Sequence, residues 1–285
     1  MANASATSLP PIGLIAGTGR VPFLVARGVR GAGRELAVAA FRGGASPRLR
    51  GLANSFRWVG IARIGSWIGV LKAAGVRQAV MVGGVRKKEI YSPWRILRYI
   101  PDWRAFRLWY VRVRSDRRDN AILLAIADEL AGEGIELISS VEYCKDHLAS
   151  EGLMTRTTVP RGAVSDVEFG WRIARASADL DIGQSLAVKE HDIIAVEAME
   201  GTDAMIRRAG QLCRSGGWTM IKVARPNQDM RVDVPTIGPA TLRNLHVARC
   251  RCLVIEAGKT IIVDKPITLA LADKLGIAVV GKTAE

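Results

Sequence analysis

Short apolar runs alternate with amphipathic stretches through the first half of the chain. The runs that predict buried strands are Ile12–Ala16, Glu35–Phe41, Ala79–Val82 and Ile135–Ile138, and helical patterns start at Pro22 and cover Trp67–Ala74 and Asn120–Leu130. Strands that alternate with helices are typical of a parallel sheet with helices on its faces. The pattern therefore predicts a Rossmann-like parallel-sheet domain over residues 10–150.

The alternation returns after a polar, threonine-rich stretch at 151–165, which is broken by Pro160 and Gly162. We expect this stretch to be a linker and residues 166–285 to form a second α/β domain. Its expected helices are Asp166–Ala178, Thr202–Cys213, Pro239–Ala248 and Leu269–Leu275, and its expected strands are Leu186–Lys189, Asp192–Glu197, Trp218–Ala224, Cys252–Glu256, Thr260–Val263 and Ala278–Val280. The fold class is α/β in both domains.

Composition narrows the classes of protein that fit this pattern. The chain has 285 residues, 49% of them hydrophobic, which is enough for a sizeable core and excludes a disordered protein. Its longest apolar runs are too short to span a bilayer, and the N-terminal tail lacks the basic and apolar segments of a secretory signal. The four cysteines lack metal-site spacing, so we expect reduced thiols in a cytosolic protein.

Charge singles out one region, which we call the basic aromatic window, Arg86–Arg118. It carries eleven Lys/Arg against three Asp/Glu, so eight of the chain's fourteen net positive charges lie in it, together with three of the seven Trp and three of the four Tyr. Aromatic rings with arginines at helical spacing suit an anionic membrane surface or single-stranded nucleic acid. A helical pair whose rings pack on the sheet and whose arginines are solvated explains the same pattern.

Two glycine turns follow predicted strands of the first domain. Gly17-Thr18-Gly19 lies between a strand and a helix, where backbone N–H groups and the helix dipole can hold a phosphate, and Gly83-Gly84 ends another strand. Pro22 occupies the place of the third glycine of a dinucleotide fingerprint, and no acidic residue closes the next strand, so bound NAD is disfavoured. A tight structural turn explains the glycines as well as a nucleotide contact does.

Carboxylates and cations concentrate in two turns of the second domain. Glu200, Gly201, Thr202 and Asp203 join a strand to a helix, and Gly201 allows close approach to the backbone. The stretch Lys222–Gly238 (KVARPNQDMRVDVPTIG) begins inside the strand that ends near Ala224. It supplies Lys222, Asn227, Gln228, Asp229, Arg231 and Asp233. If the two turns meet, a phosphate and a divalent cation can share the site.

Histidine contributes little to this picture. The three histidines lie far apart in the sequence, which disfavours both a zinc site and a Ser-His-Asp triad. A hydrolase with this composition would need carboxylates and a hard metal ion such as Mg²⁺ to activate water and balance phosphate charge.

In its polar turns and its glycine turns the chain resembles the LpxI family of UDP-2,3-diacylglucosamine pyrophosphatases. The resemblance rests on Val196–Gly210 (VEAMEGTDAMIRRAG), Asp181–Val188 (DIGQSLAV), Lys222–Leu242, Gly13–Pro22 and Val82–Lys87, in the expected order along the chain. It implies two domains with the substrate between them. The implied activity is Mg²⁺-dependent cleavage of UDP-2,3-diacylglucosamine to UMP and 2,3-diacylglucosamine 1-phosphate in lipid A synthesis. The implied location is cytoplasmic, with peripheral association with the inner membrane and no nucleic-acid partner.

With this resemblance we assign roles to the polar turns. Asp229 and Asp233 are the expected metal ligands or water-orienting carboxylates, with Glu200 and Asp203 as further candidates. Lys222 and Arg231 neutralise the pyrophosphate, and substrate contacts are expected from Thr202, Asn227, Gln228, Gly201 and, in the first domain, Gly17, Thr18, Gly19, Gly83 and Gly84.

The chain departs from the family at one turn, and two other classes of protein stay open. Arg118-Asp119-Asn120 stands where the family carries a Gly-Asp-Asp-type turn, so one carboxylate is kept and one is replaced by an amide. A sugar-nucleotide dehydrogenase would need NAD. A non-catalytic basic protein that binds nucleic acid or an anionic membrane surface would explain the charge but not the clustered carboxylates. The sequence leaves a homo-oligomer open.

Overall fold

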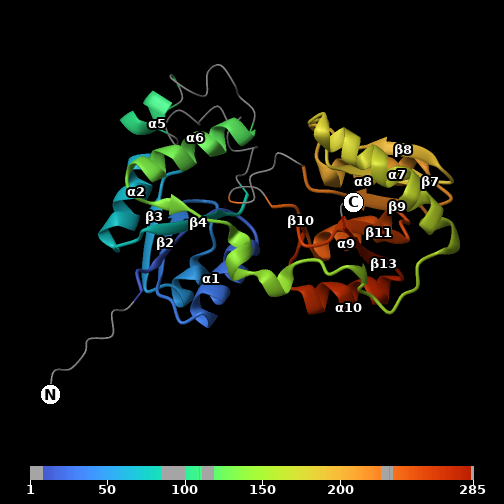
Figure 1. Cartoon of the computed structure of the whole chain (residues 1–285), viewed down its shortest axis with the longest axis horizontal. Coiled ribbons are helices and arrows are strands. Elements are labelled where there is room, and N and C mark those ends of the chain that lie inside the picture. The colour runs from blue at the N-terminus through green and yellow to red at the C-terminus, as the bar shows by residue number, and fades with distance from the viewer. Residues whose placement is uncertain are drawn as a thin grey trace. The chain divides into compact units, whose positions relative to one another are not determined.

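The computed structural model describes residues 9–84, 100–108, 110, 119–225, 231 and 234–283, with the backbone alone for 119–121. These residues divide into two compact units (Figure 1). Unit 1 holds the chain up to Cys144 together with Arg231, and unit 2 holds the other described residues from Lys145 onward. Each unit has its own sheet and its own helices, which confirms the predicted α/β class.

Unit 1 is built on a five-stranded parallel sheet in the order β3-β2-β1-β4-β5. Its elements are β1 (Ile12–Ala16), α1 (Val21–Gly31), β2 (Leu36–Phe41), η1 (Pro47–Leu52), β3 (Ser55–Val59), α2 (Ile64–Ala73), β4 (Gln78–Val82), α5 (Trp103–Leu108), α6 (Asp119–Gly132), β5 (Glu136–Leu137) and η3 (Ser140–Tyr143). The strand order reverses between β1 and β4, and in such sheets ligands bind outside the carboxyl ends of the strands near this point. The predicted Rossmann-like sheet is confirmed.

Two helices cover one face of the unit 1 sheet. Trp67 and Leu71 of α2 and Leu130 of α6 belong to the same buried cluster as Ile15 and Phe41 of the strands. Helix α1 lies on the opposite face of the sheet (Figure 1). The amphipathic pattern of α1 and its Pro22 near the helix start explain why the chain turns back directly after β1.

Unit 2 contains a six-stranded mixed sheet in the order β6-β13-β11-β9-β7-β8, and β10 pairs with β12 apart from it. Its elements are η4 (Lys145–His147), β6 (Gly152–Leu153), α7 (Arg161–Asp179), β7 (Ser185–Lys189), β8 (Asp192–Val196), α8 (Thr202–Leu212), β9 (Thr219–Lys222), β10 (Thr236–Ile237), α9 (Pro239–Val247), β11 (Cys252–Glu256), β12 (Ile261–Ile262), α10 (Lys265–Leu275) and β13 (Ala278–Lys282). The three central strands β9, β11 and β13 are parallel, and β7 runs antiparallel to β9.

Alternating side chains of these strands face two different helical layers. Ile221 and Val254 pack with Trp171 and Ala174 of α7, whereas Met220, Leu253 and Ile255 pack with α8, α9 and α10 on the other face. A sheet buried on both faces explains why its central strands read as nearly continuous apolar runs.

The structure differs from the expected linker at 151–165. This stretch lies within unit 2, where β6 pairs with β13 and the backbone N–H of Thr157 donates to Asp273 at 2.8 Å. Helix α7 already begins at Arg161, within the stretch. Pro160 stands immediately before the first turn of α7. Proline is compatible with this position, because no intrahelical hydrogen bond needs its missing N–H.

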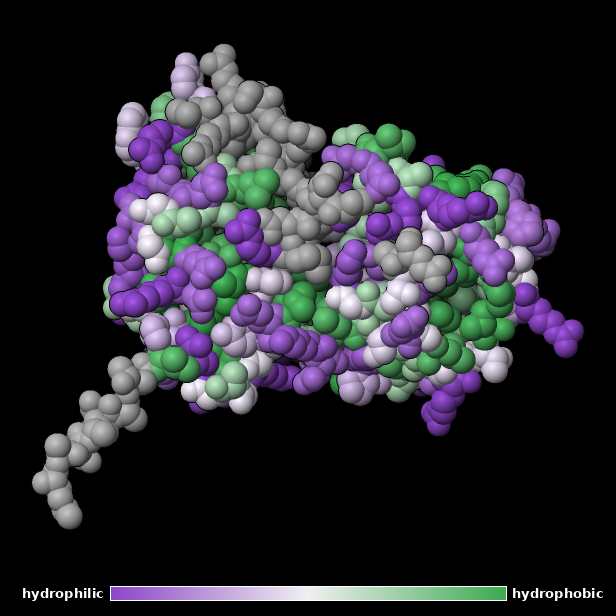
Figure 2. Space-filling view, viewed as in Figure 1, coloured by the Kyte–Doolittle hydropathy of each residue, from purple (hydrophilic) through white to green (hydrophobic). Residues whose placement is uncertain are grey.

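The described surface carries small apolar areas between hydrophilic ones, as Figure 2 shows for one face. Among the described helices, none is long and apolar enough to cross a membrane.

Candidate active site

Three polar turns meet at one edge of the unit 2 sheet. In the strand register, Lys222 at the end of β9 lies opposite Ser185 at the start of β7 and Ile255 near the end of β11. Because β8 runs antiparallel to β7, its end at Val196 reaches the same edge. The strand that carries Lys222 therefore ends beside the turn that contains Thr202.

Lys222 is the centre of a buried chain of hydrogen bonds at this edge. Its side chain is buried, with the residue only 3% exposed, and its Nζ donates to Thr202 Oγ1 at 3.0 Å and to Ser185 Oγ at 3.3 Å. The Thr202 hydroxyl donates in turn to Glu197 Oε1 at 2.8 Å. The second carboxylate oxygen of Glu197 is buried without a hydrogen-bond partner among the described residues. An ammonium group, two hydroxyls and a carboxylate are thus preorganised together, although the sequence analysis gave Glu197 and Ser185 no role.

Two glycines shape the turns around this chain. Gly183 lies so close to the end of β8 that a Cβ atom there would be 1.9 Å from the carbonyl oxygen of Glu197. Gly201 has a φ of 82°, which L-residues rarely adopt, and open space where a Cβ would be. Gly183 is therefore required by packing and Gly201 by its backbone conformation.

Glu200 and Asp203, the two further metal-ligand candidates, each have a protein partner. Glu200 Oε1 accepts from Arg208 at 2.6 Å, and Glu200 Oε2 accepts from the backbone N–H of Ala198. Backbone N–H groups, first that of Glu200 itself, and the Arg208 guanidinium lower the pKa of Glu200 below its usual value. Asp203 Oδ1 accepts from the Asn244 amide of α9 at 2.9 Å. A carboxylate oxygen that accepts one hydrogen bond keeps a second lone pair, so these partners orient both side chains without preventing either from binding a metal ion.

Glu256 is a buried carboxylate that the sequence analysis did not select. It ends β11 with no exposed surface, and both of its oxygens accept from the Arg175 guanidinium, at 3.1 and 3.2 Å. Lys259 lies 2.8 Å away, and the backbone N–H of Ala224 donates to Glu256 Oε2 at 2.7 Å. The carboxylate fixes the chain where it leaves β9. The only sequence signal for it is an acidic residue at the end of an otherwise apolar strand.

The remaining predicted residues of this edge lie outside the described part of the chain. Asn227, Gln228, Asp229 and Asp233 are among them, and their roles stay predictions. Arg231 is described and exposed. Arg118 and the side chains of Asp119 and Asn120, which form the turn that departs from the family, also lie outside the description. Among the described residues, no group of three His, Cys, Asp or Glu side chains is placed to hold a metal ion.

Backbone hydrogen bonds join the two glycine turns of unit 1, at Gly17–Gly19 and Gly83–Gly84. The backbone N–H of Gly17 donates to Val82, and Thr18 and Gly84 exchange backbone hydrogen bonds of 2.8 and 3.1 Å. A Cβ on Gly17 would lie 2.6 Å from the Gly83 carbonyl oxygen, and one on Gly83 would lie 2.6 Å from that of Thr18. Close backbone packing thus gives a structural reason for Gly17 and Gly83, whereas Gly19 has no neighbour at this distance.

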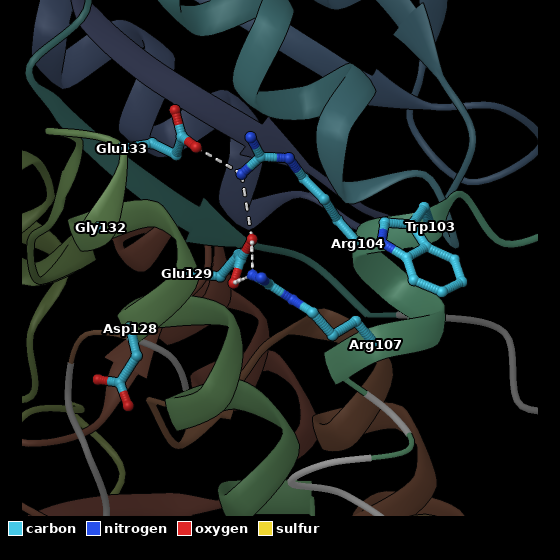
Figure 3. A pocket seen from close by; sticks show the side chains of 7 residues that line it. All are labelled: Trp103, Arg104, Arg107, Asp128, Glu129, Gly132 and Glu133. Carbon is cyan, nitrogen blue, oxygen red and sulfur yellow. Dashed lines mark hydrogen bonds and ion pairs between the residues drawn. The ribbon is translucent and has the colours of Figure 1, made fainter.

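The described part of the basic aromatic window, residues 100–108 and 110, contains α5, which lies beside α6 (Figure 3). Arg104 pairs with Glu129 of α6 at 3.1 Å and with Glu133, the residue after α6, at 2.6 Å, and Arg107 pairs with Glu129. The side chains of these two arginines stay 38% and 57% exposed, and their charges are paired with carboxylates from the last turn of α6 and the residue that follows it. Trp103 and Phe106 are 75% and 49% exposed, and their rings stack with centroids 5.7 Å apart.

Comparison with known proteins adds the following findings. The family model of the LpxI N-terminal domain matches residues 11–147, and that of the LpxI C-terminal domain matches residues 150–280. A protein of Caulobacter vibrioides (strain ATCC 19089 / CIP 103742 / CB 15), named UDP-2,3-diacylglucosamine pyrophosphatase LpxI, is 33% identical over 279 residues. These cover 95% of this chain and 96% of that protein.

Proposed function

The chain belongs to the LpxI family, and from this premise we propose that it is a UDP-2,3-diacylglucosamine diphosphatase of lipid A synthesis. The products of the proposed reaction are UMP and 2,3-diacylglucosamine 1-phosphate. The observation that carries the proposal is the 33% identity, over nearly the whole of both chains, to a protein named UDP-2,3-diacylglucosamine pyrophosphatase LpxI. The polar edge of unit 2 supports it, since a cation, two hydroxyls and a carboxylate meet there.

Each described residue at that edge has a proposed part in the reaction. Lys222 holds one positive charge in a buried setting, where it stabilises negative charge far better than in water. Thr202 and Ser185 fix its ammonium, and Glu197 fixes the Thr202 hydroxyl, so little reorganisation is needed when the diphosphate binds. Arg231 belongs to unit 1, and its proposed part is to add a second cation for the departing phosphate. The diphosphate is attacked by water directly.

The proposed metal ion is Mg²⁺, which prefers oxygen ligands. The unpartnered oxygen of Glu197 has the right chemistry, while Glu200 accepts from Arg208 and Asp203 accepts from Asn244 through Oδ1. Among the described residues no group of three acidic, His or Cys side chains is placed to hold a metal ion, and we assign the ligands first to Asp229 and Asp233. When bound, Mg²⁺ neutralises diphosphate charge and makes a coordinated water more acidic.

The decisive experiment measures release of UMP from detergent-dispersed UDP-2,3-diacylglucosamine with Mg²⁺. We expect Asp229→Ala or Asp233→Ala to lower kcat by roughly 10²–10⁴-fold, the usual effect of losing a group that handles the attacking water. Asp192→Ala is the matched control, because Asp192 is exposed at the start of β8, at the opposite edge of the sheet. If folded wild type releases no UMP, the activity is refuted and a non-catalytic basic protein becomes the better explanation.

We also propose that the enzyme works in the cytoplasm, at the surface of the inner membrane. Its proposed substrate carries two acyl chains, which stay in a bilayer. The exposed rings of Trp103, Phe106 and Tyr110 support this location, because amphipathic aromatic side chains favour the headgroup region.

A further inference from the structure

Glu256 lies at the polar edge of unit 2, on the other face of the sheet from the Lys222 ammonium. It follows Val254 by two positions in β11, and Val254 packs with α7, so the carboxylate points to the α7 side, where Arg175 binds it. Lys222 points to the α8 side, where Thr202 accepts from it. The two groups are therefore linked through the backbone at the end of β9.

A carboxylate has about four hydrogen-bond acceptor sites, and in Glu256 all of them are used. Oε1 accepts from Arg175 at 3.2 Å and lies 2.8 Å from the Lys259 ammonium, and Oε2 accepts from Arg175 at 3.1 Å and from the Ala224 N–H at 2.7 Å. The residue also has no exposed surface. Glu256 therefore has no oxygen left for a metal ion or for the substrate.

Stability alone does not explain a buried carboxylate of this kind. Its ion pairs must first offset the large cost of removing the charges from water, and apolar side chains of similar volume often make a fold equally stable or more so. An apolar side chain, however, cannot accept a hydrogen bond. Ala224 is only 1% exposed, so its N–H needs an acceptor inside the protein, and Glu256 supplies it.

The hydrogen bond to Ala224 holds the chain directly after Lys222, the last residue of β9. On one side of the chain the Val223 N–H donates to the Gln184 carbonyl at 2.9 Å, and on the other side the Ala224 N–H donates to Glu256. The backbone is therefore fixed from both sides at the point where β9 presents the Lys222 side chain.

We propose that Glu256 is a positioning residue for the hydrolysis, an inference that rests on the proposed function. By fixing Ala224 it keeps the Lys222 ammonium in the place where the diphosphate is to be neutralised. It also sets the direction in which the chain leaves β9 toward Asp229, five residues after Ala224. Misplacing a group that acts in the transition state by about 1 Å can lower a rate roughly 100-fold.

Two double variants differ only in whether position 256 can accept from Ala224. Glu256→Leu/Arg175→Met, the apolar variant, removes the acceptor, whereas Glu256→Gln/Arg175→Met, the amide variant, keeps an amide oxygen. In the apolar variant we expect the kcat of UMP release to fall about 10–100-fold with KM nearly unchanged, and the amide variant should recover most of this loss. The control Asp273→Asn weakens a carboxylate contact of the same kind, to the Thr157 N–H at 2.8 Å, and should keep kcat.

Hydrogen exchange of the Ala224 amide, followed by NMR on the full chain, gives a readout that does not depend on turnover. In wild type this amide should be protected like that of Met220 inside β9, although Ala224 lies beyond the strand. In the apolar variant it should exchange about tenfold faster or more, since a hydrogen bond to a charged group contributes roughly this factor. The amide variant and Asp273→Asn should keep most of the protection.

Rapid exchange of Ala224 in wild type would overturn the proposal without any variant. Wild-type kcat in the apolar variant would overturn it as well, and so would an equal fall of kcat in the apolar and amide variants or a fall that only follows the folded fraction. The first of these results, with UMP still released, leaves the proposed function intact. If wild type releases no UMP, the hydrolysis is refuted, and the exchange rates alone decide whether Glu256 fixes the end of β9.

Discussion

Gly183 is a single residue on which the geometry of the candidate active site depends. Its turn passes the end of β8 so closely that a methyl group would meet the Glu197 carbonyl at 1.9 Å. The Ser177 hydroxyl donates to the carbonyl of Gly183 at 3.1 Å and holds the turn in place from α7. Any movement of Glu197 would be passed on to Thr202 and Lys222 through their hydrogen bonds.

We expect Gly183→Ala to destabilise unit 2 by about 1–3 kcal/mol, the usual effect of overpacking, and to lower UMP release more than stability alone explains. Gly162→Ala is the control: Gly162 lies in the first turn of α7 with open space around it, so alanine should stabilise by about 0.4–1 kcal/mol. Urea unfolding followed by circular dichroism measures both. Equal behaviour of the two variants would contradict the close approach.

At the scale of an element, α5 combines an anchored face with an exposed one. Asp102 accepts from the backbone N–H of Ala105 and of Gly65, so it caps α5 and joins it to the start of α2. Arg104 and Arg107 hold the helix to α6, and hydrogen bonds from Lys72 and Arg104 lower the pKa of Glu133. The anchored face leaves Trp103 and Phe106 exposed, and Tyr110 stacks on Phe106 with ring centroids 6.2 Å apart.

We therefore expect the aromatic rings of α5, rather than its arginines, to contribute to vesicle binding. Trp103→Ala/Phe106→Ala should lower the partition coefficient about tenfold or more, since burying one such side chain contributes roughly 1.5–3 kcal/mol. Sedimentation with vesicles of phosphatidylethanolamine and phosphatidylglycerol measures this partition. Leu180→Ala/Val247→Ala removes comparably exposed apolar residues of unit 2 and should bind like wild type. Wild-type binding by the α5 variant would exclude the aromatic contact.

At the scale of the whole molecule, each unit is stabilised by its own apolar core. Trp67, Leu71 and Leu130 are buried in unit 1, and Trp218, Leu242 and Leu245 are buried in unit 2. Cores of this kind follow from apolar burial, roughly 25 cal/mol for each Å² removed from water, and do not need an ion to form.

Removal of Mg²⁺ should accordingly stop the reaction without unfolding the protein. We expect EDTA to abolish UMP release, excess Mg²⁺ to restore it, and the Tm to stay unchanged, because a weakly bound ion adds little to stability. The residual rate of Asp229→Ala serves as the control and should not respond to EDTA. Full activity in EDTA would refute the metal requirement, and a large fall in Tm would mean that the ion stabilises the fold.

The sequence by itself determined the elements that repeat a local pattern. The buried strand Ile12–Ala16 and the strand at Cys252–Glu256 were predicted at their observed bounds, because a run of apolar residues between polar turns is a local signal. The short strand at Ser55–Val59 has exposed and half-buried residues and gave no such signal. The resemblance to the family rests on the long motifs around Asp181, Glu200 and Lys222. These motifs can be identified from residue types alone, without knowing which side chains they contact in the fold.

Tertiary structure alone decided which polar groups meet. Lys222 and Thr202 were both selected from the sequence, but they are twenty positions apart, and their contact depends on how α8 and β9 pack. Glu256 and Arg175 are separated by eighty-one positions, and Arg104 and Glu129 by twenty-five, so no local sequence pattern predicts either ion pair. Hydrophobic periodicity is set by neighbours along the chain, whereas a buried charge finds its partner only after the sheet and helices have packed.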